Sequence, residues 1–98
     1  WNTQGADGGA EEPIDVVIQV TGWVARVVQE RLWHSTQKTR VLDGLGELVE
    51  VCMQLGNLSE VTQLVLGWGR FAKVVAPAAL VETVRDELQA AMTQYQQP

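Results

Sequence analysis

The chain has 98 residues, 46% of them hydrophobic, which suits one domain with a modest core and excludes a second independent domain. Its formal charge is −5 at pH 7, but three of its 12 acidic residues lie in the first 13 positions, so the remaining body neither favours nor excludes nucleic acid. The single cysteine, Cys52, excludes an internal disulfide, and no apolar stretch approaches the roughly 20 residues of a membrane span. We therefore expect a cytoplasmic protein without membrane contact and a buried free thiol at Cys52.

The sequence divides into a predicted linker and a single domain. Residues 1–13 are rich in glycine and acid, which is typical of a flexible linker, and residues 14–98 form the domain. Because the chain opens on Trp1 without a methionine, we expect the biological protein to be longer.

The first two elements follow from side-chain periodicity. Residues 15–20 (DVVIQV) alternate between two faces and are rich in β-branched side chains, which predicts a strand. A helix over residues 22–33 follows, with the hydroxyl of Thr21 as its expected cap and Trp23 on its apolar side.

A hairpin is predicted next. Residues 36–42 are a short run that alternates only weakly, whereas residues 47–55 alternate more clearly, with Val49, Val51, Met53 and Leu55 on one face. Asp43 and Gly44 predict the turn between them, since Asp-Gly tolerates the positive φ that a hairpin requires.

The second helix is predicted over residues 57–69. Asn57 and Glu60 have the spacing of a capping box, and Gly67 or Gly69 can supply the residue that ends the helix.

Residues 70–76 predict a last strand, and Pro77 suits the first turn of a long helix over residues 78–95. The apolar stripe of this helix comprises Leu80, Val84, Leu88, Met92 and Tyr95.

This order predicts an α+β fold, namely a ferredoxin-like βαββαβ sandwich with an additional C-terminal α-helix. Helices would cover one face of the sheet. The other face could bind a partner, pack on a neighbouring domain or be covered by the third helix. It would carry Val17, Gln19, Glu50 and Cys52.

The segment RLWHSTQ, residues 31–37, holds the only histidine of the chain, His34, beside Trp33. With no second histidine and one distant cysteine, neither a metal site nor catalysis is expected. The favoured interpretation is a structural corner, in which Trp33 buries apolar surface between helix and strand and His34 bonds nearby backbone.

A binding role is the alternative for this segment, because basic residues cluster around Trp33 and His34. Cations beside an aromatic ring suit phosphate contact with base stacking, or contact with a partner protein. A solvated face that pairs with an acidic partner subunit is the plainer possibility. The basic residues are Arg26, Arg31, Lys38 and Arg40.

The chain resembles the WCX domain, the C-terminal extension that follows the WYL domain in bacterial transcriptional regulators. The resemblance covers residues 14 to 95 and depends on an ordered set of short elements. These are Arg31, Trp33, His34 and Gln37 at the first corner, then Gly69, the AKVV strand, Pro77 with Leu80, and Tyr95. It implies a non-enzymatic module, preceded by helix-turn-helix and WYL domains, that contributes to homodimerisation and to effector or nucleic-acid response. Because linkers of this family often carry a Trp before the first strand, the resemblance also implies that Trp1 docks back on the domain or on a neighbouring one.

Two other functions are open by analogy with the fold alone. Ferredoxin-like modules also serve as small-molecule regulatory domains, and some small ones hydrolyse acyl phosphates with an Arg and an Asn. For the enzyme, the first strand-to-helix loop offers only Gly22 and Arg26. No cofactor is expected.

Overall fold

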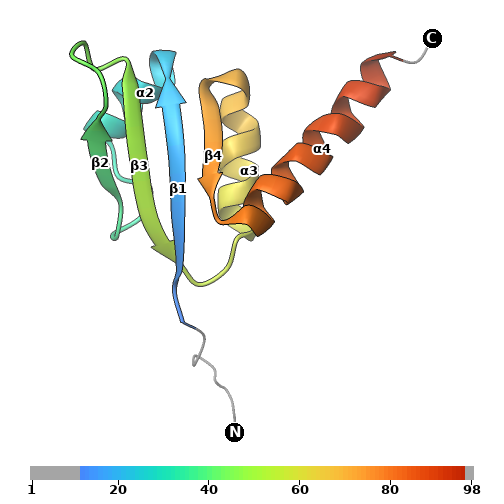
Figure 1. Ribbon diagram of the computed structural model, residues 1–98, viewed down its shortest axis with the longest axis horizontal. Coiled ribbons are helices and arrows are strands. Elements are labelled where there is room, and N and C mark those ends of the chain that lie inside the picture. The colour runs from blue at the N-terminus through green and yellow to red at the C-terminus, as the bar shows by residue number, and fades with distance from the viewer. Residues whose placement is uncertain (1–11, 97–98) are drawn as a thin grey trace, which may run out of the picture.

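The computed structural model describes residues 12–96, so the predicted linker, apart from Glu12 and Pro13, and the predicted docking of Trp1 lie outside the described residues. Figure 1 shows a sheet with helices behind it and a long helix that leaves its edge. The elements in chain order are β1 (Ile14–Thr21), α2 (Gly22–Glu30), β2 (Lys38–Val41), β3 (Leu48–Leu55), α3 (Ser59–Trp68), the 3₁₀ helix η1 (Gly69–Phe71), β4 (Ala72–Ala76) and α4 (Ala78–Gln96).

The four strands form one antiparallel sheet in the order β2-β3-β1-β4, which confirms the ferredoxin-like plan with an additional C-terminal helix. β1 and β3 pair along their whole length, from Ile14 opposite Leu55 to Thr21 opposite Leu48. Strand β3 lies between β1 and β2, and β1 lies between β3 and β4, so each strand–helix–strand connection skips one strand. As a result, β2 and β4 form the two edges of the sheet.

The core lies between the sheet and its helices, as strand alternation predicts. The inward side chains of β1 are 0% exposed, and those of β3 are at most 4% exposed. Valines of α2 and α3 and Trp68 cover them. The inward strand residues are Val16, Ile18, Val20, Val49, Val51 and Met53.

Helix α4 packs beside α3 and β4 and then stands away from the sheet (Figure 1). Its predicted apolar stripe is present, but only Leu80 and Val84 are buried. Leu88, Met92 and Tyr95 are 49%, 54% and 88% exposed, because the helix diverges from the body after its second turn.

The predicted start and end of the first helix are wrong in detail. Thr21 forms no side-chain cap bond, since it still belongs to β1 and the chain turns at Gly22, which has a φ of +59°. The helix ends at Glu30 rather than near Trp33, because Arg31 is extended. Trp23, expected on the apolar side, is 44% exposed and packs edge-on against Phe71.

Two predicted turns also differ. The β2–β3 connection is a six-residue loop over residues 42–47, and its positive φ occurs at Gly46 instead of Gly44. The N-cap of α3 is Leu58, so the predicted capping box is wrong, although the Oδ1 of Asn57 accepts a hydrogen bond from the Ser59 N–H at 3.1 Å.

The end of α3 is as predicted. Gly69, with a φ of +59°, donates its N–H to the carbonyls of Leu66 and Val65 and lets the chain turn toward β4.

Candidate functional site

The predicted corner is built around the buried side chain of Gln37. Its Oε1 accepts the Trp33 N–H at 2.8 Å, and its Nε2 donates to the carbonyls of Val28 at 3.3 Å and Arg31 at 3.1 Å. These carbonyls lie in the last turn of α2 and just after it, where helical partners are missing. One amide therefore closes the end of α2 and fixes the path of the chain toward β2.

Trp33 anchors this corner against helix α3. Its half-buried ring meets Trp68 edge to face, with centroids 5.5 Å apart and an interplanar angle of 88°. The guanidinium carbon of Arg31 lies 5.6 Å from the Trp33 ring centroid, on a position suited to a cation–π contact. The prediction that Trp33 buries apolar surface between helix and strand is confirmed.

His34 and Thr36 bind the corner to the sheet. The Nδ1 of His34 accepts the Thr36 N–H at 3.1 Å, which confirms the predicted bond from His34 to nearby backbone. The hydroxyl of Thr36 accepts the Gln54 N–H at 2.9 Å and lies 3.2 Å from the Gln54 carbonyl. This side chain thus extends the pairing of β3 beyond the start of β2.

The opposite face of the sheet has no helix over it in the described part of the chain (Figure 1). Cross-strand partners share a face, so the register assigns its side chains in rows. We call this surface the open face. Its two central rows are Arg40, Glu50, Gln19 and Lys73, then Lys38, Cys52, Val17 and Ala76.

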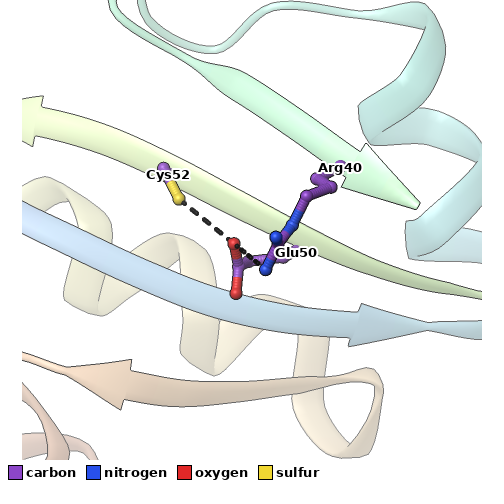
Figure 2. Close-up of polar contacts among 3 residues, drawn as sticks. All are labelled: Arg40, Glu50 and Cys52. Atoms are coloured by element: carbon purple, nitrogen blue, oxygen red, sulfur yellow. Dashed lines mark hydrogen bonds and ion pairs between the residues drawn. The ribbon is translucent and has the colours of Figure 1, made fainter. Parts of the chain in front are cut away.

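One carboxylate organises the β2 side of the open face. The Oε1 of Glu50 lies 3.2 Å from the Nη2 of Arg40 and 3.7 Å from the Sγ of Cys52 (Figure 2). Partial burial, followed by the negative charge of Glu50 and its hydrogen bond, raises the pKa of the Cys52 thiol. The prediction of a buried thiol is wrong. Cys52 is half-buried, because its neighbour Val51 points into the core and Cys52 therefore points to the open face.

The structure distributes the predicted basic cluster over different surfaces. Arg26 is exposed on α2, in the helical layer, and Arg31 is exposed at the corner beside Trp33. Lys38 and Arg40 point from β2 to the open face, and Arg40 is paired with Glu50. Proximity in sequence therefore does not produce one continuous strip.

Within residues 12–96, no group of three or more His, Cys, Asp or Glu side chains is placed to hold a metal ion. No helix over the same residues has both the length and the apolar character of a membrane span.

Sequence reasoning missed a second basic surface, in the angle between β4 and α4. Arg70, Lys73 and Arg85 line this angle, although they are separated along the chain and form no charge run. The one signal in the sequence for a surface here was the apolar stripe of α4. It continues to Tyr95, although the rest of the domain is too short to cover its second half.

The four-stranded antiparallel sheet, with two helices on one face and a third at its edge, defines a ferredoxin-like α+β domain with an uncovered sheet face. The chain belongs to the WCX domain family, which matches residues 12–92. WCX is the C-terminal extension found in WYL-domain transcriptional regulators, and the family is non-catalytic. No curated protein sequence matches the chain.

Proposed function

We propose that this domain is the regulatory and dimerisation module of a WYL-type transcriptional regulator, with helix-turn-helix and WYL domains preceding it. In this role it contributes to the response of the regulator to an effector or to nucleic acid, in the cytoplasm. Membership of the WCX family supports the setting. The observation that carries the dimerisation role is the open face.

The open face suits a second copy of the chain because it carries both signs of charge around a neutral centre. At the centre, Val17, Gln19 and Cys52 are half-buried by their neighbours in the sheet, and no helix of residues 12–96 covers them. The flanking charges are cationic at Lys38, Arg40 and Lys73 and anionic at Asp15 and Glu50. Two such faces related by a two-fold axis can place cations of one copy near acids of the other, while Arg40 is already paired with Glu50 within its own chain.

The size of this face sets the expected affinity. Four strands spaced about 4.8 Å apart, over roughly six residues of about 3.3 Å, give about 400 Å² per copy and about 800 Å² in total. This is below the roughly 1,200 Å² of stable interfaces, so the isolated domain should dimerise weakly, with a Kd on the order of 100 μM. Dimerisation of the other domains would strengthen the contact through effective concentration.

Sedimentation velocity up to about 1 mM tests this proposal. Val17→Lys, at the centre of the open face, should shift the chain to monomer with little change in melting temperature. Gln63→Lys, on the exposed surface of α3, is the matched control and should dimerise like the wild type. A wild-type chain that stays monomeric at 1 mM, or a Val17→Lys variant that dimerises normally, contradicts the proposal.

A small-molecule regulatory role is the second candidate. It is favoured by a hollow of about 490 Å³ at one end of the open face, lined by Asp15, Lys38, Cys52 and Gln54 among others. An ammonium and a carboxylate on its walls suit a zwitterionic ligand such as an amino acid. A saturable rise in melting temperature with an amino acid, lost in Lys38→Ala, supports this role, and no rise across the common amino acids contradicts it.

A further inference from the structure

A groove runs between the edge strand β4 and helix α4. Two hollows of about 220 Å³ and 490 Å³ meet there, with Ala72 and Leu88 common to both. The strand contributes Lys73 and Val74 to its wall, and α4 faces them across the gap. Figure 1 shows α4 standing away from the strand on this side.

The strand side of the groove is a free sheet edge. Within residues 12–96, β4 pairs only with β1, so alternate N–H and C=O groups on its other side have no strand partner. Such an edge accepts an added extended segment by main-chain hydrogen bonds.

The helix side of the groove is apolar. Leu88, Met92 and Tyr95 continue the stripe that Leu80 and Val84 begin in the core, and about half or more of each of these three side chains is exposed. Ala91 lies between them and leaves room for another side chain. An occupant with apolar residues facing α4 would remove this surface from water.

All charged side chains that line the groove are cations. They are Arg70 in the middle of η1, Lys73 on the strand and Arg85 on the helix. This bias is local, because the chain as a whole carries a formal charge of −5. The occupant favoured by charge complementarity is therefore acidic.

The same charges argue against a second copy of the chain as the occupant. Pairing β4 with a second β4 would bring the Lys73 side chains of both copies to one edge, together with Arg70 and Arg85 from each. Lysine on an edge strand is a common device against such self-pairing.

We propose that this groove binds an acidic, extended peptide segment of a partner protein, in which apolar residues alternate with Asp or Glu. The segment adds a strand to β4 through its main chain. Its apolar side chains pack on Leu88, Met92 and Tyr95, and its carboxylates face Arg70, Lys73 and Arg85. This groove is distinct from the open face proposed for dimerisation, although Lys73 belongs to both.

Fluorescence anisotropy with a labelled eight-residue peptide of alternating Glu and Val tests the proposal. Binding is measured on the Val17→Lys chain, so that failure of the dimerisation proposal leaves this test unaffected. The acidic peptide should bind and weaken with salt. Adding Lys73→Glu and Arg85→Glu together should weaken binding roughly tenfold, whereas Arg26→Glu, an exposed cation on α2, should leave it unchanged.

Further peptides separate the parts of the recognition. A peptide with Lys in place of Glu should not bind. N-methylation removes main-chain donors, so of two peptides methylated at the odd or at the even residues, one should lose binding. Equal binding of the Lys peptide, or no loss in Lys73→Glu with Arg85→Glu, overturns the charge assignment. Full binding of both N-methylated peptides overturns strand addition, and no binding of the acidic peptide at 1 mM chain overturns the whole proposal.

Discussion

Gln37→Ala is expected to be among the most damaging single changes at the corner. The substitution removes three hydrogen bonds and leaves the Trp33 N–H and the carbonyls of Val28 and Arg31 without their partner. A buried polar group that loses its partner costs about 1–3 kcal/mol, and a partly exposed one that regains water costs about 1 kcal/mol or less.

The Val28 carbonyl bond is buried and the other two are partly buried, so we expect a loss of about 3 kcal/mol in the free energy of unfolding. For a domain of this size, 1 kcal/mol corresponds to roughly 4–8 °C, so the melting temperature should fall by roughly 12–24 °C. Differential scanning calorimetry and urea unfolding followed by tryptophan fluorescence give the two quantities.

Gln63→Ala is the matched control, because it removes the same amide from an exposed position on α3. It should change stability by less than about 0.5 kcal/mol. Gln37→Glu keeps the acceptor for Trp33 but turns an oxygen toward two carbonyls, so it should be at least as damaging as Gln37→Ala. A Gln37→Ala variant within 0.5 kcal/mol of the control would refute the assignment of Gln37 as the residue that holds the corner.

Three further predictions follow from other contacts. Gly22→Ala should lower the free energy of unfolding by about 3 kcal/mol, because the φ of Gly22 is +59° and a Cβ there would lie 2.7 Å from the Phe71 ring. Gly69→Ala, at the same φ but with open space around the Cβ, should cost less, and urea unfolding measures both. Glu50→Gln should speed alkylation of Cys52 by iodoacetamide at pH 8, because the Glu50 charge raises the thiol pKa and the thiolate is the nucleophile; an unchanged rate would contradict this. The last prediction concerns single-stranded DNA and the four predicted cations, of which Lys38 and Arg40 lie on the open face, Arg31 at the corner and Arg26 on α2. The slope of log K against log salt should be no steeper than about −1.4, since one strand can reach only two of them, and a slope near −2.8 would indicate that all four predicted cations act together. Binding should be lost on triple charge reversal of Arg31, Lys38 and Arg40.

Periodicity predicts the sheet well because it reports burial directly. The alternation around Ile18 and Val51 places each residue on the correct face, and the register then pairs them opposite one another. The positions where prediction failed are those decided by contacts distant in sequence. Helix α2 ends at Glu30, and the carbonyls of Val28 and Arg31 accept hydrogen bonds from the Gln37 side chain, a contact that no local pattern reveals.

The basic cluster shows the same limit for the site. Arg26 and Lys38 are 12 residues apart in sequence, but the corner between them carries the chain from the helical layer to the edge of the sheet. Their closeness in sequence therefore overstates how close the two side chains lie on the surface of the protein. The cations of the groove are the reverse case, since Lys73 and Arg85 belong to a strand and a helix whose divergence only the fold reveals.

Lys73 links the two proposed surfaces. Its register with Gln19 places it in a row of the open face, and it also lines the groove beside α4. A dimer that turns the Lys73 ammonium toward an acid of the second copy leaves less positive charge for an acidic peptide, and a bound peptide has the converse effect. Because such coupling is reciprocal, the factor by which the peptide weakens the dimer must equal the factor by which dimerisation weakens the peptide. A partner segment bound at the edge of the sheet would in this way bias the oligomeric state of the regulator without touching the centre of its dimer interface.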